Sequence, residues 1–281
     1  MKFNLGCQLS YSIIQSSTLV FNISAVNNEY QEILDENLQI EPQLEVEEYT
    51  DPILKNRYFR LNAQPGKLKV AYQATAQIQP FYAEPDTIAE VLPAELPLDI
   101  FPYLYPSRYC QSDQLLQLAA SEFGNLKLGF SRVTAICNWI YDHITYLSGS
   151  TDQSTSAADT VVERAGVCRD FAHLGIALCR ALNIPARFVS GYAYSLEPPD
   201  FHACFEAYLD HRWYLFDPTR LVPQNGLIRI GTGRDATDAS FATIFGLVQM
   251  EQMHLFVKQV QEGESSSQET PGYTVKAIAI V

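Results

Sequence analysis

The run Arg164-Ala-Gly-Val-Cys-Arg-Asp-Phe-Ala-His-Leu174 decides the fold of the second half of this chain. From this run onward, apolar residues recur at helical spacing, at Val167, Phe171, Leu174, Leu178 and Leu182. Gly166 allows a sharp turn before the helix, and Asn183 with Pro185 ends it. The sequence therefore predicts a buried helix that begins near Val167 and carries Cys168 in its first turn.

A cysteine at the start of a helix is a candidate nucleophile. The free backbone N–H groups and partial positive charge of a helix N-terminus favour the thiolate, which is the reactive form of the side chain. A buried structural cysteine is also possible, since that role is common for this residue type. Cys179 illustrates it, because that residue lies near the same helix face but about 16 Å further along. The choice for Cys168 therefore depends on its partners.

Partners of a suitable type lie in the strands that follow. Alternation predicts strands at 186–194, 202–209 and 212–216, with Asp210-His211 as a two-residue turn between the last two. This turn pairs residue 209 with 212 and residue 204 with 217, so that His202 and Asp217 lie diagonally on one face, with Cβ atoms roughly 5–8 Å apart. A carboxylate there would hold the imidazole in one tautomer and support its charge. Without this geometry, His202 would be interpreted as a solvated surface histidine.

Several ordered motifs resemble the bacterial transglutaminase-like cysteine protease superfamily. The resemblance runs from about residue 100 to 246, and the residues before it resemble the β-rich N-terminal region of many members. The motifs are Arg164 to His173, Asn183-Ile-Pro-Ala-Arg-Phe-Val-Ser-Gly-Tyr192, Phe201-His-Ala, Trp213-Tyr-Leu-Phe-Asp-Pro-Thr219, Pro106-Ser-Arg-Tyr-Cys110 and Gly233-Arg-Asp-Ala-Thr-Asp238. The resemblance implies an α+β fold, with a papain-like core in which a helix-start cysteine packs on an antiparallel sheet, preceded by an N-terminal β-sandwich.

The resemblance also implies roles for individual residues. Cys168 would be the nucleophile, His202 the general base and acid, and Asp217 the carboxylate that orients the ring. The reaction would be attack on an amide carbonyl of a peptide or protein, followed by a thioester intermediate. The backbone N–H of Cys168 is the first oxyanion donor expected, and Tyr146 is the candidate for the second.

Three further residues are candidates for the lining of the site. Many members of the superfamily carry a tryptophan two residues after the histidine, where this chain has Cys204. The smaller residue is expected to reshape the floor of the site and to change substrate preference and oxidative sensitivity. Arg234 and Asp235 belong to a loop that we expect to border the site, with either a structural or a substrate-contacting role.

The reaction itself has two forms with the same three residues. Hydrolysis transfers the acyl group to water, whereas a transglutaminase transfers it to an amine and needs an acceptor channel that excludes water. No such channel is recognisable in the sequence, so hydrolysis of peptide or isopeptide amides is favoured. Two less favoured interpretations are a non-enzymatic binding module and a metal site built from Cys168, His202, Cys204 and Asp217. The spacing lacks paired ligands in one loop, so we expect no metal and no cofactor.

Three segments organise the chain. Residues 1–80 contain short β-rich runs separated by turn residues and are predicted to form a β-sandwich. Residues 81–111 are rich in proline and are predicted to form an ordered connector. Residues 112–281 are predicted to form the catalytic domain, with Tyr273–Val281 as a final strand.

Charge and composition narrow the partners. The formal net charge of −13 makes binding to nucleic acid or to an anionic membrane unfavourable. The N-terminus shows no sustained apolar run typical of a secretory signal. The six cysteines form no Cys-x-x-Cys pair, which favours reduced thiols. We therefore expect a cytoplasmic location.

Overall fold

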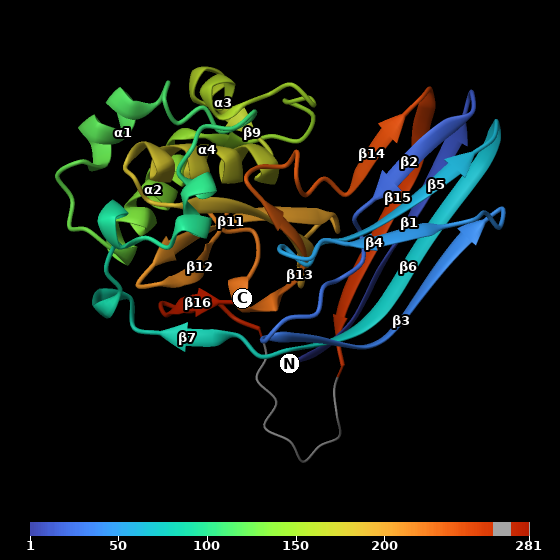
Figure 1. Ribbon diagram of the computed structural model, residues 1–281, viewed down its shortest axis with the longest axis horizontal. Coiled ribbons are helices and arrows are strands. Elements are labelled where there is room, and N and C mark those ends of the chain that lie inside the picture. The colour runs from blue at the N-terminus through green and yellow to red at the C-terminus, as the bar shows by residue number, and fades with distance from the viewer. Residues whose placement is uncertain (261–270, 281) are drawn as a thin grey trace, which may run out of the picture.

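The computed structural model describes residues 1–260 and 271–280, which form two lobes side by side (Figure 1). One lobe consists of helices around a central sheet, and the other is a pair of packed sheets made of long strands. The α+β fold with an N-terminal β-sandwich that the sequence predicted is confirmed. In the part of the chain that the structure describes, every helix is too short or too polar to cross a membrane.

The sandwich lobe contains two antiparallel four-stranded sheets. Their strand orders are β15-β1-β6-β3 and β14-β2-β5-β4. Burial alternates along β6, so that one face of the strand enters the core while the other meets solvent. The strands are β1 (Lys2–Ile13), β2 (Ser17–Phe21), β3 (Gln31–Glu41), β4 (Glu47–Thr50), β5 (Arg57–Ala63), β6 (Gly66–Ile78), β14 (Ala242–Phe245) and β15 (Val248–Gln259).

Two of these strands come from the other end of the chain. β15 pairs with β1 along almost its whole length, and β14 pairs with β2. The assignment of all of residues 112–281 to the catalytic domain is therefore wrong for 242–259. These strands are largely exposed on one side and contribute few residues to the core. Their sequences consequently lack the strong apolar alternation by which the remaining strands are recognised.

The central sheet of the helical lobe has the order β12-β11-β10-β13, with all neighbours antiparallel. It consists of β10 (Ala186–Ala193), β11 (Phe201–Leu209), β12 (Arg212–Phe216) and β13 (Leu227–Gly233). Helix α4 (Cys168–Ala181) packs against β10 and β11, and α1 (Leu116–Phe123), α2 (Phe130–His143) and α3 (Ala157–Glu163) surround it. Figure 1 shows these helices gathered on one side of the sheet.

Close contact between α4 and the central sheet requires a small residue at position 175. A Cβ atom on Gly175 would come within 2.5 Å of the Phe205 ring on β11. The helix is buried along most of its length, in one apolar core with the α4-facing side chains of β11 and β12. Burial on this scale fixes the axis of α4, and with it the position of Cys168.

The connector and the C-terminal strand lie together beneath the central sheet. The connector contains β7 (Phe81–Ala83) and the 3-10 turns η1 (Pro85–Thr87), η2 (Pro93–Glu95) and η3 (Leu98–Tyr103). β7 pairs with β16 (Ala277–Ala279), which packs against β12. The final strand predicted at Tyr273–Val281 is thus shorter than expected, and Val281 lies outside the described residues. A further 3-10 turn, η4 (Gln224–Gly226), precedes β13.

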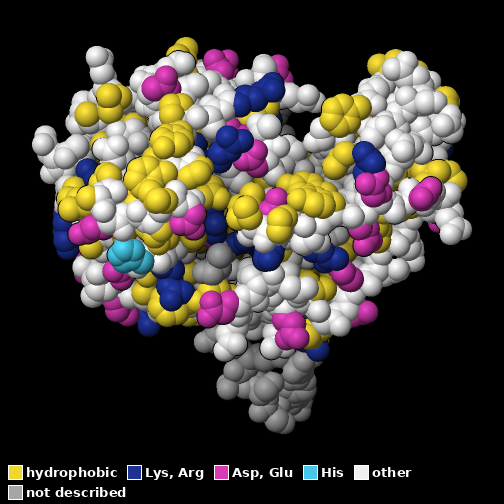
Figure 2. Space-filling view, viewed as in Figure 1, with side chains coloured by type: hydrophobic (Ala, Val, Ile, Leu, Met, Phe, Trp, Pro, Cys, Tyr) yellow, Lys and Arg dark blue, Asp and Glu magenta, His cyan; other side chains and the backbone are white. Residues whose placement is uncertain are grey.

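An apolar interface joins the two lobes. Tyr192 on β10 and Phe201 on β11 belong to the core of the sandwich, together with Ile228 and Ile230 of β13. The Tyr192 hydroxyl also donates a hydrogen bond to the carbonyl oxygen of Ile23, at 2.8 Å. Because the sandwich core extends onto the central sheet, the two lobes share buried surface. Figure 2 shows that the molecular surface is hollowed between the lobes at the top of the view.

Candidate active site

Cys168 is the first residue of α4, as the sequence predicted. The short strand β9 (Ala165–Gly166) leads into the helix, and a Cβ on Gly166 would approach the Asp170 side chain to 2.8 Å. Glycine at position 166 therefore allows the Asp170 side chain to lie close against the backbone of β9. The Cys168 side chain is half-buried, and its Sγ lies 4.0 Å from the carbonyl oxygen of Phe201 at the start of β11. The thiol thus faces the end of β11 that carries His202.

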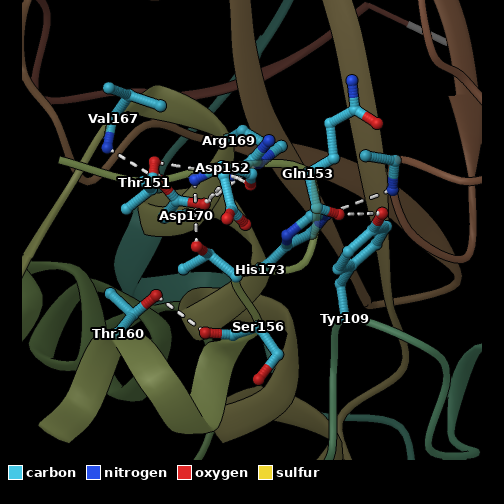
Figure 3. Close-up of polar contacts among 12 residues, drawn as sticks. Tyr109, Thr151, Asp152, Gln153, Ser156, Thr160, Val167, Arg169, Asp170 and His173 are labelled. Atoms are coloured by element: carbon cyan, nitrogen blue, oxygen red, sulfur yellow. Dashed lines mark hydrogen bonds and ion pairs between the residues drawn. The ribbon is translucent and has the colours of Figure 1, made fainter. Parts of the chain in front are cut away.

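A buried carboxylate holds the first turn of α4 in place (Figure 3). Asp170 Oδ2 accepts hydrogen bonds from the backbone N–H of Val167, at 2.9 Å, and from the Thr151 hydroxyl, at 2.7 Å. Its Oδ1 accepts from Arg169 Nε at 3.0 Å, and the same guanidinium donates to the Asp152 carbonyl oxygen at 2.7 Å. Asp170 therefore caps the helix and ties the loop at 151–152 to the residues beside Cys168.

His202 and Asp217 meet through the tight turn that the sequence predicted. Asp210 and His211 both have positive φ, and the register pairs Leu209 with Arg212. The pairing runs on to Phe205 and Phe216, so that His202 and Asp217, just beyond this pair, lie near one another. His202 Nε2 and Asp217 Oδ2 are 2.8 Å apart, and both side chains are almost fully buried.

The second oxygen of Asp217 is also occupied. Asp217 Oδ1 accepts hydrogen bonds from the backbone N–H of Thr219, at 2.9 Å, and from its hydroxyl, at 2.7 Å. These bonds fix the orientation of the carboxylate, so that Oδ2 is directed at the ring. Thr219 is a supporting residue that sequence reasoning missed. An acceptor two residues before a threonine is the local signal by which it is recognisable.

Electrostatics favour a charged imidazole at His202. Burial opposes the charge, but the Asp217 carboxylate and the Cys168 thiol outweigh it and raise the pKa of His202 to about 10. Nδ1 of His202 makes no hydrogen bond to any residue in 1–260 or 271–280. Because Nε2 is hydrogen-bonded to Asp217, Nδ1 is the ring nitrogen that can interact with the Cys168 sulfur. A protonated ring beside the sulfur favours the thiolate.

Tyr146, the candidate second oxyanion donor, lies beside Cys168. It belongs to the two-residue strand β8 (Thr145–Tyr146), which runs parallel to β9 and brings residue 146 opposite Gly166. Burial and the neighbouring Cys168 thiol both raise the pKa of Tyr146, while the backbone N–H of Cys168 acts in the opposite direction. The phenol is therefore neutral at physiological pH and remains available as a hydrogen-bond donor near the sulfur.

Cys204 lies two residues beyond His202 on the same strand and is only 1% exposed. Burial raises the pKa of its thiol well above the ordinary value, and the charges of Asp217, Glu206 and Cys168 act in the same direction. The side chain is therefore a neutral thiol packed with Val189 and Leu215 in a small apolar cluster. Unlike Cys168, it is closed off from solvent.

The structure does not bring Arg234 and Asp235 to the thiol. The Arg234 carbonyl oxygen accepts from Arg180, in the last turn of α4, and its side chain pairs with Asp238. Asp235 accepts hydrogen bonds from the backbone N–H groups of Tyr109 and Thr237. Both residues therefore belong to a loop that supports the far end of α4. Of the two roles considered for Arg234 and Asp235, these contacts favour the structural one over contact with substrate.

The described residues around Cys168 are not arranged as a metal-binding site. Within residues 1–260 and 271–280, no cluster of three or more histidine, cysteine, aspartate or glutamate side chains is arranged to hold a metal ion. The arrangement instead brings together a half-buried thiol, a charged imidazole and an oriented carboxylate. Chemically, that combination can generate a thiolate and deliver a proton to a leaving group.

Comparisons with known proteins identify the family of the chain. Residues 117–218 match the transglutaminase-like superfamily, and residues 1–97 match the N-terminal domain of bacterial transglutaminases. The first match includes Cys168, His202 and Asp217. A crystal structure described as that of a “Putative Cysteine Protease from Cytophaga hutchinsonii” is 46% identical, with a TM-score of 0.93, over 100% of this chain and 98% of that one. The chain belongs to the transglutaminase-like superfamily, a family of thiol enzymes.

Mycobacterial relatives match over shorter stretches. An uncharacterized protein of Mycobacterium leprae is 33% identical over 117 residues, which cover 38% of this chain and 42% of that protein. An uncharacterized protein of Mycobacterium bovis is 32% identical over 184 residues, covering 59% and 56%. The chain thus spans about half the length of these relatives, and its membership of the family rests on the full-length likeness to the Cytophaga protein.

Proposed function

We propose that this protein is a cysteine hydrolase that cleaves peptide or isopeptide amide bonds through Cys168, His202 and Asp217. The observation that carries the proposal is the orientation of His202. Its Nε2 is held 2.8 Å from Asp217, and its Nδ1 is left without a partner among the described residues, beside the thiol that begins α4. Buried polar atoms are normally hydrogen-bonded, so an Nδ1 without a fixed partner, next to a thiol, is available to exchange a proton with the sulfur.

The first half of the reaction forms the acyl-enzyme. The Cys168 thiolate attacks the amide carbonyl carbon, and the oxygen takes up the negative charge. We assign the backbone N–H of Cys168 and the Tyr146 hydroxyl, which interact with one another in the structure, as the donors to that oxygen. His202 gives its Nδ1 proton to the leaving amine, the C–N bond breaks, and a thioester remains. Asp217 stabilises the imidazolium before this transfer and holds its tautomer afterwards.

The second half releases the acyl group. The neutral His202 ring takes a proton from water, and the resulting hydroxide attacks the thioester carbonyl. The C–S bond breaks, and the products are a carboxylic acid and the regenerated thiolate–imidazolium pair. An amine in place of water gives a new amide through the same steps, which is the transglutaminase outcome. The half-buried position of the thiol leaves it open to solvent, which favours water as the acceptor.

A product analysis tests the proposal. Purified protein is incubated with a library of peptide and γ-glutamyl amides, with and without added primary amine, and the products are identified by mass. We expect carboxylic acids in both conditions and no products from Cys168→Ala. If the main products contain the added amine, the reaction is acyl transfer and not hydrolysis. Equal product formation by Cys168→Ala would overturn the proposed mechanism altogether.

A further inference from the structure

A cleft between the two lobes is bounded by the loop that leads from β10 into β11, the strand that carries His202. Its volume of 520 Å³ lies in the range of pockets that hold a drug-sized ligand. Loop residues 193–200 form one wall, and His254 to Lys258 of β15 form the opposite wall. Tyr194 anchors the loop by packing against Phe3 of the sandwich, with ring centroids 5.6 Å apart. Both lobes therefore shape this cleft.

One residue that lines the cleft lies close to the candidate active site. Asp200 lines the cleft and directly precedes Phe201, whose carbonyl oxygen is 4.0 Å from Cys168 Sγ. The Asp200 carboxylate interacts electrostatically with the His202 ring and with the Tyr146 hydroxyl, which flank the thiol. A chain bound in the cleft would consequently place one of its side chains at Asp200 when its carbonyl group reaches Cys168.

Asp200 is a carboxylate without a cationic partner. Its Oδ1 accepts from the backbone N–H of Phe201 at 2.7 Å, and no lysine or arginine of residues 1–260 or 271–280 forms an ion pair with it. The residue is exposed to solvent at the cleft, and partial burial of its carboxyl raises the pKa of Asp200, against which the Phe201 N–H and the charge of His202 act. The His202 imidazole, whose charge also acts on Asp200, is already paired with Asp217. The charge of Asp200 is thus available to a bound molecule.

We propose that Asp200 selects polypeptide substrates that carry a lysine or arginine side chain close to the amide attacked by Cys168, with the interlobe cleft holding that part of the chain. This inference rests on the proposed function, because it assigns a substrate class to the same site. Charge-assisted hydrogen bonds from a guanidinium or ammonium group to a carboxylate are stronger than neutral ones. The acidic chain, with its net charge of −13, also attracts cationic substrates over longer distances.

Charged residues elsewhere in the cleft supply matched controls. Lys258 and His254 on β15 line the same cleft, but they belong to the sandwich lobe and not to the loop that leads into β11. Glu197 lies on the Asp200 side, three residues further from Phe201. If only the charge next to the thiol decides selectivity, neutralising Glu197 or Lys258 leaves the preference intact.

Paired covalent probes test the assignment. Peptidyl vinyl sulfones carry either arginine or citrulline, its uncharged analogue of similar shape, at the first, second or third residue before the electrophile. The Cys168 thiolate adds to the alkene, and His202 supplies the proton to the adjacent carbon. Rates of labelling are measured for the wild type, Asp200→Asn, Glu197→Gln and Lys258→Met, and the modified residue is mapped by mass. The Asp200→Asn variant keeps an oxygen that accepts from the Phe201 N–H.

We expect the arginine probe to label wild-type Cys168 about three to ten times faster than the citrulline probe in at least one position. The ratio falls to about one in Asp200→Asn and stays at its wild-type value in the two controls. Equal rates for both probes at all three positions in the wild type, or a preference that survives Asp200→Asn, would overturn the inference alone. Failure of every probe to label Cys168 would instead overturn the proposed function, and the inference with it.

Discussion

The side-chain amide of Gln31 hydrogen-bonds both backbone groups of Arg229. Gln31 Nε2 donates to the Arg229 carbonyl oxygen at 2.9 Å, and Gln31 Oε1 accepts from the Arg229 N–H at 2.7 Å. Arg229 lies on β13, an edge strand of the central sheet. Asn56 makes the same pair of bonds to Thr232, three residues further along β13. Two amides of the sandwich thus occupy the edge at which another strand would pair.

Loss of the Gln31 amide should loosen this junction. Gln31→Leu leaves the buried Arg229 N–H without a partner, and we expect the free energy of unfolding to fall by about 1–3 kcal/mol. Gln39→Leu is the matched control, because Gln39 is exposed on the same strand β3. It should change stability by no more than about 0.5 kcal/mol. Urea unfolding measures both, and equal losses in the two variants would contradict the role of Gln31.

Reactivity of the thiols should be confined to one cysteine. Cys168 is half-buried next to His202, whereas Cys179 is completely buried in the core of the helical lobe. We expect Cys168→Ala to abolish labelling by an acylating thiol probe and Cys179→Ala to leave labelling at the wild-type rate. Intact-mass measurement counts the modified thiols under native conditions. Labelling of folded Cys168→Ala at an undiminished rate would contradict the assignment.

Turnover should depend on the charge of Asp217 rather than on its shape. Asp217→Asn retains an oxygen or an N–H group opposite His202 Nε2, so the fold is preserved, but the ring is then held in the wrong tautomer or loses support for its charge. We expect turnover to fall by about two to four orders of magnitude, with an unchanged circular dichroism spectrum. An undiminished rate would remove Asp217 from the mechanism.

The same substitution should have a pH-dependent effect on stability. Burial lowers the pKa of His202, but Asp217 outweighs burial, so that the pKa rises from 6.5 to about 10 in the folded protein. A raised folded-state pKa gives stability that is complete below pH 6.5 and is lost as the pH rises through about 10. The stability difference between the wild type and Asp217→Asn should therefore narrow as the pH rises through this window. Urea unfolding at several pH values measures it, and a widening difference would contradict the charged pair.

The cap of α4 should matter for activity as well as for stability. Asp170→Asn removes the charge that Val167, Thr151 and Arg169 share, and we expect the free energy of unfolding to fall by about 1–3 kcal/mol, together with slower labelling of Cys168. Asp159→Asn provides the control, because Asp159 caps α3 in the same way but lies at the surface. In Asp159→Asn, only the free energy of unfolding should fall, and the rate of Cys168 labelling should stay at the wild-type value. Urea unfolding and labelling rates are measured in parallel, and unchanged labelling in Asp170→Asn would limit the cap to a structural role.

Local sequence signals were sufficient for the core of the site. The helix that starts at Cys168 follows from apolar spacing and from Gly166, and the meeting of His202 with Asp217 follows from one two-residue turn. These features depend on residues near one another in sequence. The capping box of α3, in which Ser156 and Asp159 exchange hydrogen bonds, is a local feature of the same kind.

Long-range relationships were not recognisable in this way. The pairing of β15 with β1 joins residues almost the whole chain apart, and an exposed edge strand carries little apolar pattern. Arg234 and Asp235 resembled site residues because the loop contains charges, yet those charges satisfy local hydrogen bonds. Asp200 has no motif around it, and only its place in the cleft, beside Phe201 and the thiol, distinguishes it.

The return of β14 and β15 to the sandwich has a consequence for biosynthesis. During translation, the outer edges of β1 and β2 emerge early but find their partners only after residues 242–259 have left the ribosome. Until then, the nascent sandwich exposes unpaired strand edges that can associate with other chains. Most of the helical lobe is made within this interval, so the segment inserted between the two halves of the sandwich can begin to fold before its neighbour is closed.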